Sequence, residues 1–212
     1  MRFGTRFIGA VDGIGDESIR TRFRMFIVPL WPIESHFVLE DSMDGFRSFP
    51  VPLNRRSVTL GYVRWWSFLG VVIGAILWWE QGAYLLVTSS TISWFASALI
   101  VGGCPADTRN KRLVLKHITG ISAPPELQPA SMRDEIYSTL IAKFETLQNR
   151  LQVSTWQELV EQPGGEKAAA VAYATARYAN ACHSDPHHLQ EAEQAWGCIS
   201  DNWNYWINQL YP

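Results

Sequence analysis

Histidine and cysteine side chains gather around residue 185 of this 212-residue chain. Neutral imidazole and thiolate are both ligands that suit zinc. Asp185 and Pro186 fall inside the group and should begin a new helix, so the histidines would not share one helix face. We therefore expect an exposed turn between two helices, with a metal site as the less favoured alternative. The residues concerned are Cys182, His183, His187, His188 and Cys198.

No catalytic signature accompanies these side chains. The sequence has no G-x-S-x-G, P-loop, H-E-x-x-H or dinucleotide-binding pattern, and the DGIGD segment at 12–16 lacks the helix that a phosphate loop needs. A net charge of −2 provides no electrostatic basis for binding nucleic acid. We expect a protein that is not an enzyme, needs no cofactor and does not bind nucleic acid.

Three tryptophans near the C-terminus, Trp196, Trp203 and Trp206, share helical spacing. Tryptophan is enriched at interaction hot spots, so these side chains are a candidate surface for a protein partner. Aromatic residues at this spacing more often belong to a core, which is the favoured interpretation.

Two apolar segments occupy residues 60–103, LGYVRWWSFLGVVIGAILWW and AYLLVTSSTISWFASALIVGG, with EQG between them. As a helix, each would cross the roughly 30 Å of hydrocarbon in a bilayer. The flanks are basic and the turn is not, which places both termini in the cytoplasm. We predict a transmembrane helical hairpin in the lipid bilayer, with a buried or re-entrant hairpin as the alternative. The flanking basic residues are Arg55, Arg56, Arg64, Arg109, Lys111, Arg112 and Lys116.

Small residues recur along both apolar segments. Gly70 and Gly74 form a GxxxG step, and Ser89, Ser93 and Ser97 recur four residues apart. Small side chains let helix backbones approach closely in lipid. We expect these two faces to pack against each other within the hairpin; contact with another copy or another membrane subunit is the alternative.

The rest of the chain flanks this hairpin, which we assign to residues 54–103. Residues 1–53 should form a small cytosolic β unit, with strands near 5–11, 18–28, 35–40 and 45–51, that leans on the membrane surface or the C-terminal domain. Residues 104–130 read as a basic, proline-rich linker, and residues 131–212 as a cytosolic α-helical bundle. Ser131 and Asp185 are candidate helix N-caps.

The FIVPLWPI run in the β unit is apolar and contains two prolines, which exclude it from a central strand. It is either a strand that leads into a buried turn or a wedge that dips into the membrane interface.

The segments GTRFIG, TRF and PLWPI resemble a G-T-x-[FY]-x-G start, a T-[KR]-[WF] strand and a P-L-x-P-[IL] turn. A loose set of uncharacterised bacterial membrane proteins carries these patterns before its membrane helices. The resemblance implies a bacterial inner-membrane protein with a small cytosolic β unit, and it implies no activity and no catalytic residues. From all these features we expect a membrane accessory or scaffold protein that presents a helical domain to another protein; a small oligomeric channel or transport subunit is the alternative.

Overall fold

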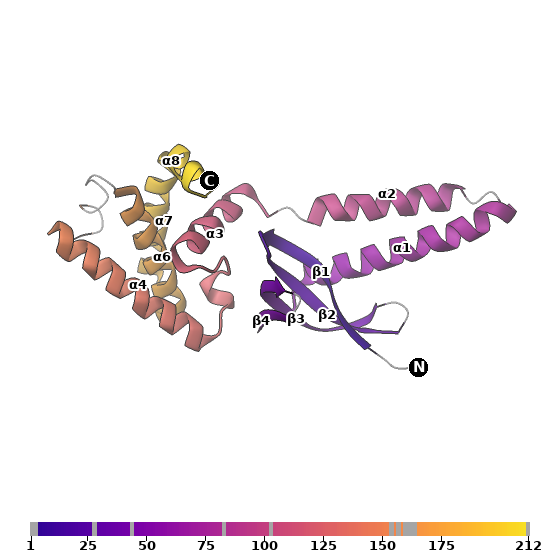
Figure 1. Ribbon diagram of the computed structural model, residues 1–212, viewed down its shortest axis with the longest axis horizontal. Helices are drawn as coiled ribbons and strands as arrows, with labels where there is room; N and C mark the ends of the chain where they lie inside the picture. Colours follow the sequence, from indigo (N-terminus) through magenta and orange to yellow (C-terminus); the bar gives the residue numbers. More distant parts are fainter. Residues whose placement is uncertain are drawn as a thin grey trace. The chain divides into compact units, whose positions relative to one another are not determined.

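The computed structural model describes residues 4–26, 29–42, 45–81, 84–101, 104–152, 155, 158 and 165–210. The chain divides into two compact units, Met1–Ala106 and Asp107–Pro212, here named unit 1 and unit 2. Unit 1 holds a β-sheet and two long helices, and unit 2 is helical (Figure 1).

An antiparallel sheet of four strands, in the order β1-β2-β3-β4, opens unit 1. Its strands are β1 (Gly4–Ile14), β2 (Glu17–Met25), β3 (Pro29–Ser42) and β4 (Gly45–Val51). Alternation along β2 buries Thr21 and Phe23 and turns Arg20, Arg22 and Arg24 to the other face. The four predicted strands are therefore present, with boundaries shifted by one to three residues, except that β3 begins at Pro29 and not near residue 35.

The prolines of FIVPLWPI lie in a strand, but in a part of it that is not central to the sheet. Pro29 and Pro32 both lie in β3, where they pair with Met25 and Phe23 of β2. Register shifts fall at both places, and β4 pairs with β3 only from Ser35 onwards, so this start of β3 is an edge. A bulged edge tolerates a residue that has no N–H to donate.

Helix α1 (Arg55–Gln81) begins directly on the sheet. Asn54 caps it, because its side-chain oxygen accepts a hydrogen bond of 3.0 Å from the Ser57 backbone N–H. The Ser57 hydroxyl, fully buried, donates to the Gly9 carbonyl at 2.5 Å and accepts from the Thr21 hydroxyl at 2.8 Å. Thr21 and Ser35 also share a hydrogen bond of 2.8 Å. These bonds join β1, β2, β3 and α1 in one buried polar network.

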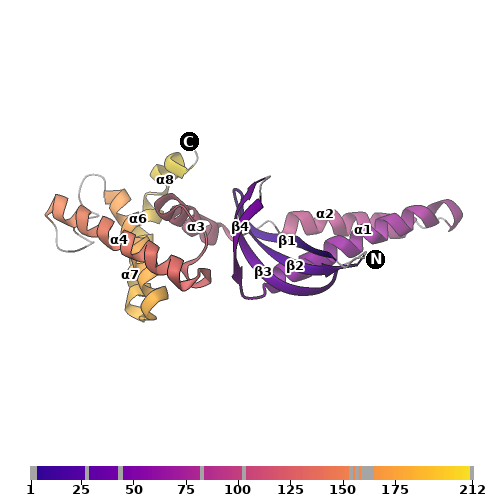
Figure 2. The ribbon, with the colours of Figure 1, turned by 60° about the horizontal axis from the view of Figure 1, so that its bottom comes forward.

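Two glycines permit the close approach of helix and sheet. A Cβ on Gly9, which has a φ of +74°, would lie 2.1 Å from the Ser57 carbonyl oxygen. A Cβ on Gly61 would lie 2.9 Å from the Phe23 ring. The sheet thus packs its core against the first turns of α1. Figure 2 shows the strands lying across this part of α1.

Helix α2 (Tyr84–Val101) lies beside α1 in both views (Figures 1 and 2). The predicted pair of transmembrane helices is nevertheless wrong. Within the described residues, one helix is long and apolar enough to cross a membrane, namely α1 over Arg55–Ile76. Over its 18 described residues, α2 does not qualify as a second such helix. The first turns of α1 pack on the sheet and so do not serve as part of a lipid-facing segment.

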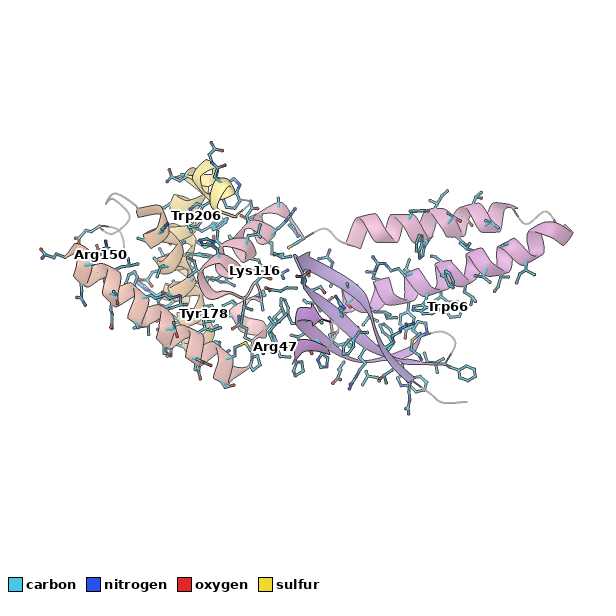
Figure 3. The ribbon with its side chains drawn as sticks, in the orientation of Figure 1. Arg47, Trp66, Lys116, Arg150, Tyr178 and Trp206 are labelled. Atoms are coloured by element: carbon cyan, nitrogen blue, oxygen red, sulfur yellow. The ribbon has the colours of Figure 1, made fainter. Side chains whose placement is uncertain are left out.

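Unit 2 packs its helices around one apolar core (Figure 3). Tyr178 and Trp206 are among its largest fully buried side chains. Buried alanines along α6 bring the backbones of neighbouring helices close together. The elements are α3 (Ala106–Thr119), η1 (Pro125–Leu127), α4 (Ala130–Leu151), α6 (Gly165–His183), α7 (Pro186–Asp201) and α8 (Trp203–Leu210).

Helix α3 belongs to this core although it lies in the segment expected to be a linker. Val114 and Leu115 are buried in the core cluster. Arg112 is 4% exposed and donates to the Ser122 carbonyl at 3.0 Å. The apolar side of α3 is therefore covered by unit 2 itself.

The helix ends of unit 2 follow the sequence signals in part. Asp185 caps α7 as predicted, since its carboxylate accepts from the His187 backbone N–H at 2.9 Å. The expected cap at Ser131 is wrong, because α4 begins at Ala130, after Pro129. The last helix breaks at Asn202, whose side chain donates to the Cys198 carbonyl at 3.1 Å and competes with the helical hydrogen bonds.

Replacement of Gly9 by alanine should destabilise unit 1 by roughly 1 to 3 kcal/mol or more, since the residue keeps a positive φ and its Cβ meets the Ser57 carbonyl. Gly13→Ala is the matched control, because a Cβ there has its nearest contact at an ordinary 3.8 Å. Hydrogen–deuterium exchange of the β1 and β2 amides in the full chain measures the effect. Equal protection in the two variants would show that the close approach is not required.

Candidate functional site

Exposed apolar side chains concentrate in unit 1. All but one of the large apolar residues that are exposed in the described part of the chain lie there; the exception is Leu189 of α7. Soluble monomers seldom expose contiguous apolar patches of this kind without a partner or a membrane to cover them. We name the part on the two long helices the apolar helix surface. It consists of Trp66, Phe68, Val72, Ile73, Ile76, Ile92, Trp94 and Phe95.

Contacts between small residues hold together the two helices that carry this surface. The Ser67 hydroxyl donates to the Ser93 hydroxyl at 3.0 Å. A Cβ on Gly70 would lie 2.4 Å from the Ser90 hydroxyl oxygen, so the absence of a side chain at Gly70 lets α2 come close. The two contacts follow opposite directions along the helices, which makes the pair antiparallel.

The structure brings some of the predicted helix-packing residues together. Gly70 and Ser93 lie at the contact between the helices, and Gly74 is buried. Ser89 is exposed, and the side chain of Ser97 lies outside the described residues. Ser67 and Ser90 supply the hydroxyls that sequence spacing missed, because no repeat of four links them to the other small residues.

A second apolar group lies where β2 and β3 meet. Leu30, Trp31 and Ile33 are exposed at the start of β3, as is Phe26 just after β2. The Tyr62 hydroxyl of α1 donates to the Leu30 carbonyl at 2.9 Å, which ties this group to the helix. The FIVPLWPI run is thus an apolar strand start with exposed side chains; Ile27 and Val28 lie outside the described residues.

The tryptophans of the C-terminal helices are mostly interior. Trp206 and Trp196 are 1% and 8% exposed, and Trp203 is half-buried against the same core. The Trp196 indole N–H donates to the Asp107 carboxylate at 3.2 Å. Trp196 and Trp206 therefore fill the core of unit 2 and are not available to a partner in this conformation.

The histidines near residue 185 do approach one another. The donor atoms of His187, His188 and Glu191 lie within 4.8 Å of each other. Glu191 contacts His188 Nδ1 at 3.1 Å and His187 Nδ1 at 3.6 Å, so an imidazole–carboxylate pairing along α7 accounts for this grouping. The His183 ring, at the end of α6, has its centre 6.5 Å from that of His188.

The cysteines do not join these histidines as ligands. The Cys182 thiol donates to Asp134 Oδ1 of α4 at 3.5 Å. Burial, together with this hydrogen bond, raises the pKa of the Cys182 thiol, which opposes the thiolate that zinc requires. Cys198 follows His188 by ten residues, or roughly 15 Å along the axis of α7.

Comparisons of the chain with models of protein families, with curated proteins and with solved structures find no match. The resemblance to bacterial membrane proteins that carry G-T-x-F-x-G and P-L-x-P-I patterns therefore stays a hypothesis.

The helix contact predicts a specific cross-link. With Cys104, Cys182 and Cys198 replaced by serine, the pair Ser67→Cys and Ser93→Cys should form a disulfide on mild oxidation, because the wild-type hydroxyls lie 3.0 Å apart. Non-reducing electrophoresis after protease cleavage between the helices measures it. Ser67→Cys with Ser89→Cys is the matched pair and should cross-link poorly, since Ser89 lies one turn of α2, or roughly 6 Å along the helix axis, from Ser93. Equal yields from both pairs would contradict this packing.

Proposed function

We propose that this chain is a membrane-attached accessory protein, in which unit 1 contacts a lipid bilayer and carries unit 2 as a module for binding another protein. The apolar helix surface is the observation that supports attachment most directly. Unit 2 keeps nearly all its large apolar side chains inside, whereas unit 1 leaves many of them outside. A bilayer covers such a surface without needing a complementary protein shape.

The exposure of α1 separates it from an ordinary core helix. Only 22% of its apolar window, Arg55–Ile76, is buried. A core helix of a soluble domain would have most of these residues covered. The proposal therefore gives α1 the role of the lipid-contacting element, with α2 packed along it.

The positions of basic and aromatic residues support the proposal that the lipid headgroups lie near the sheet. Arg64, Trp65 and Trp66 follow one another on α1, just past the turns that pack on the sheet. Trp31 of β3 is exposed, and the guanidinium of Arg24 lies 5.7 Å from the centre of its ring. Tryptophan and arginine favour this boundary, where the ring and the aliphatic stem meet lipid and the polar end meets water.

The orientation is also part of the proposal. Arg55, Arg56 and Arg64 lie at the sheet end of α1, and the positive-inside tendency favours the cytoplasmic side for that end. The membrane implied by the sequence resemblance is the bacterial inner membrane.

Charge introduced into the apolar helix surface should release the chain from membranes. We expect Ile73→Asp combined with Ile76→Asp to move the protein out of the floating vesicle fraction, because a charged residue in hydrocarbon costs about 2.5 to 3.5 kcal/mol on insertion scales. Flotation of the purified full chain with phosphatidylcholine vesicles measures this.

Leu189→Asp is the control, because it places the same charge on an exposed apolar residue of unit 2. It should leave flotation unchanged. If the wild-type chain does not float with vesicles, or if the double variant floats as well as the wild type, lipid attachment through this surface is refuted.

A further inference from the structure

The beginning of α7 brings three side chains with metal-binding atoms together on unit 2. One donor atom from each of His187, His188 and Glu191 lies within 4.8 Å of the other two, and this is the one such group within the described part of the chain. Asp185 caps the helix at the His187 backbone N–H, which fixes where both histidines start along it. Glu191 lies one turn further on and contacts both imidazoles.

We propose that His187, His188 and Glu191 bind one divalent transition-metal ion of the zinc class, with water in the remaining position. The site lies in unit 2 and goes beyond the proposed function, because it does not depend on membrane attachment. Two imidazole nitrogens and one carboxylate oxygen form a ligand set with which zinc keeps a fourth position for water. Calcium and magnesium prefer oxygen ligands throughout, so the two histidines favour a transition metal.

The separations between the donor atoms are close to those in a zinc site. Ligands about 2.0 to 2.1 Å from zinc, at tetrahedral angles, lie roughly 3.3 Å from one another. Glu191 lies 3.1 Å from His188 Nδ1 and 3.6 Å from His187 Nδ1, on either side of this value. The two imidazoles have to approach each other more closely than this. The side chain of His187 is 70% exposed, so it can rotate toward the other ligands without disturbing the core.

The contact between Glu191 and the two histidines forms without a metal, yet it uses the atoms that would bind one. His187 Nδ1 faces one carboxylate oxygen, Oε1, and His188 Nδ1 faces the other, Oε2. A metal would take the place of the protons between these atoms, and its binding would release them. The carboxylate therefore holds both imidazoles near the metal position in advance, which lowers the entropic cost of binding.

Packing also restrains two of the three ligands. His188 and Glu191 line a pocket of about 140 Å³ whose other walls come from α4 and α6, including the rings of Tyr137 and Phe144. The side chains of His188 and Glu191 are 30% and 33% exposed. Their partial burial limits how far they can move apart, so the pair keeps its geometry while His187 closes the site.

The neighbouring side chains at the end of α6 lie outside this ligand set. The His183 ring packs edge-on against Tyr137, with the ring centres 5.6 Å apart. The Cys182 thiol is engaged with the Asp134 carboxylate. Zinc binding at the proposed site should therefore persist when the thiols are removed.

Zinc titration of the full chain tests the site. Purified protein in mild detergent, with any affinity tag removed and metal stripped by a chelator, competes for zinc with a chromophoric indicator. The wild type should bind zinc saturably. His187→Gln and Glu191→Gln should each weaken binding about tenfold or more, since even the loss of a group that only supports a ligand costs about 10- to 100-fold. His187→Gln is the primary variant, because its side chain is exposed and its backbone N–H still meets the Asp185 cap.

His36→Gln is the matched control. His36 also pairs with a glutamate, since its Nε2 lies 3.0 Å from Glu34 Oε1, but no third donor completes a group with them within the residues that the structure describes. The zinc affinity of this variant should stay within about twofold of the wild type. The same should hold for a chain in which serine replaces all three cysteines, Cys104, Cys182 and Cys198. Circular dichroism of each variant verifies that its helices are retained.

Cobalt(II) provides a second measurement, because nitrogen and oxygen ligands give visible absorption without a sulfur-to-metal charge-transfer band. The absence of saturable zinc binding by the wild type would overturn the proposal, as would wild-type affinity in both His187→Gln and Glu191→Gln. Loss of binding in the cysteine-free chain, or a charge-transfer band with cobalt, would assign the metal to the thiols and overturn the proposed ligand set.

Discussion

The packing of the sheet on α1 in unit 1 depends on the buried hydroxyl of Ser57. It donates to the Gly9 carbonyl and accepts from Thr21, which in turn is bonded to Ser35. An unpartnered hydroxyl in this dry position would cost the chain stability, so three strands and α1 are fixed in one arrangement. The same arrangement requires glycine at position 9 and places the bulge of β1 beside α1.

The two units differ in how far their apolar side chains are buried. Unit 2 encloses its aromatic side chains and even Arg112, whose guanidinium is satisfied by Ser122. In unit 1 the sheet covers only the beginning of α1, and the rest of α1 and α2 cover each other on one side. Small residues at this contact, such as Gly70 against Ser90, bring the helices together but leave their outer faces exposed. That contrast is the physical basis for assigning the membrane contact to unit 1.

Local sequence signals predicted much of the backbone. Alternation and turn residues indicated the four strands, and Asp185 with Pro186 indicated the start of α7. Signals that depend on tertiary contacts were missed. Hydropathy alone could not show that the first turns of α1 pack on the sheet. The prediction of two transmembrane helices was wrong because, within the described residues, α1 is the one helix long and apolar enough to cross a membrane. The start of β3 was predicted near residue 35 and not at Pro29, because a strand tolerates these prolines only where β4 does not pair with it.

The candidate site was predictable only in part. Gly70 and Ser93 were singled out by the spacing of small residues, whereas their closest partners, Ser90 and Ser67, follow no repeat. Trp196 and Trp206 lie inside unit 2, as the favoured interpretation of their spacing predicted.

The most direct test of the account is the environment of α1 in a bilayer. A nitroxide label at Ile76→Cys, in a chain without its native cysteines and reconstituted in phosphatidylcholine vesicles, reports accessibility to oxygen and to a water-soluble nickel complex. Lipid contact predicts that oxygen reaches Ile76 far better than nickel does, while a label at Leu189→Cys in unit 2 shows the reverse. If both labels are equally accessible to nickel, α1 faces water and the apolar helix surface does not contact the membrane.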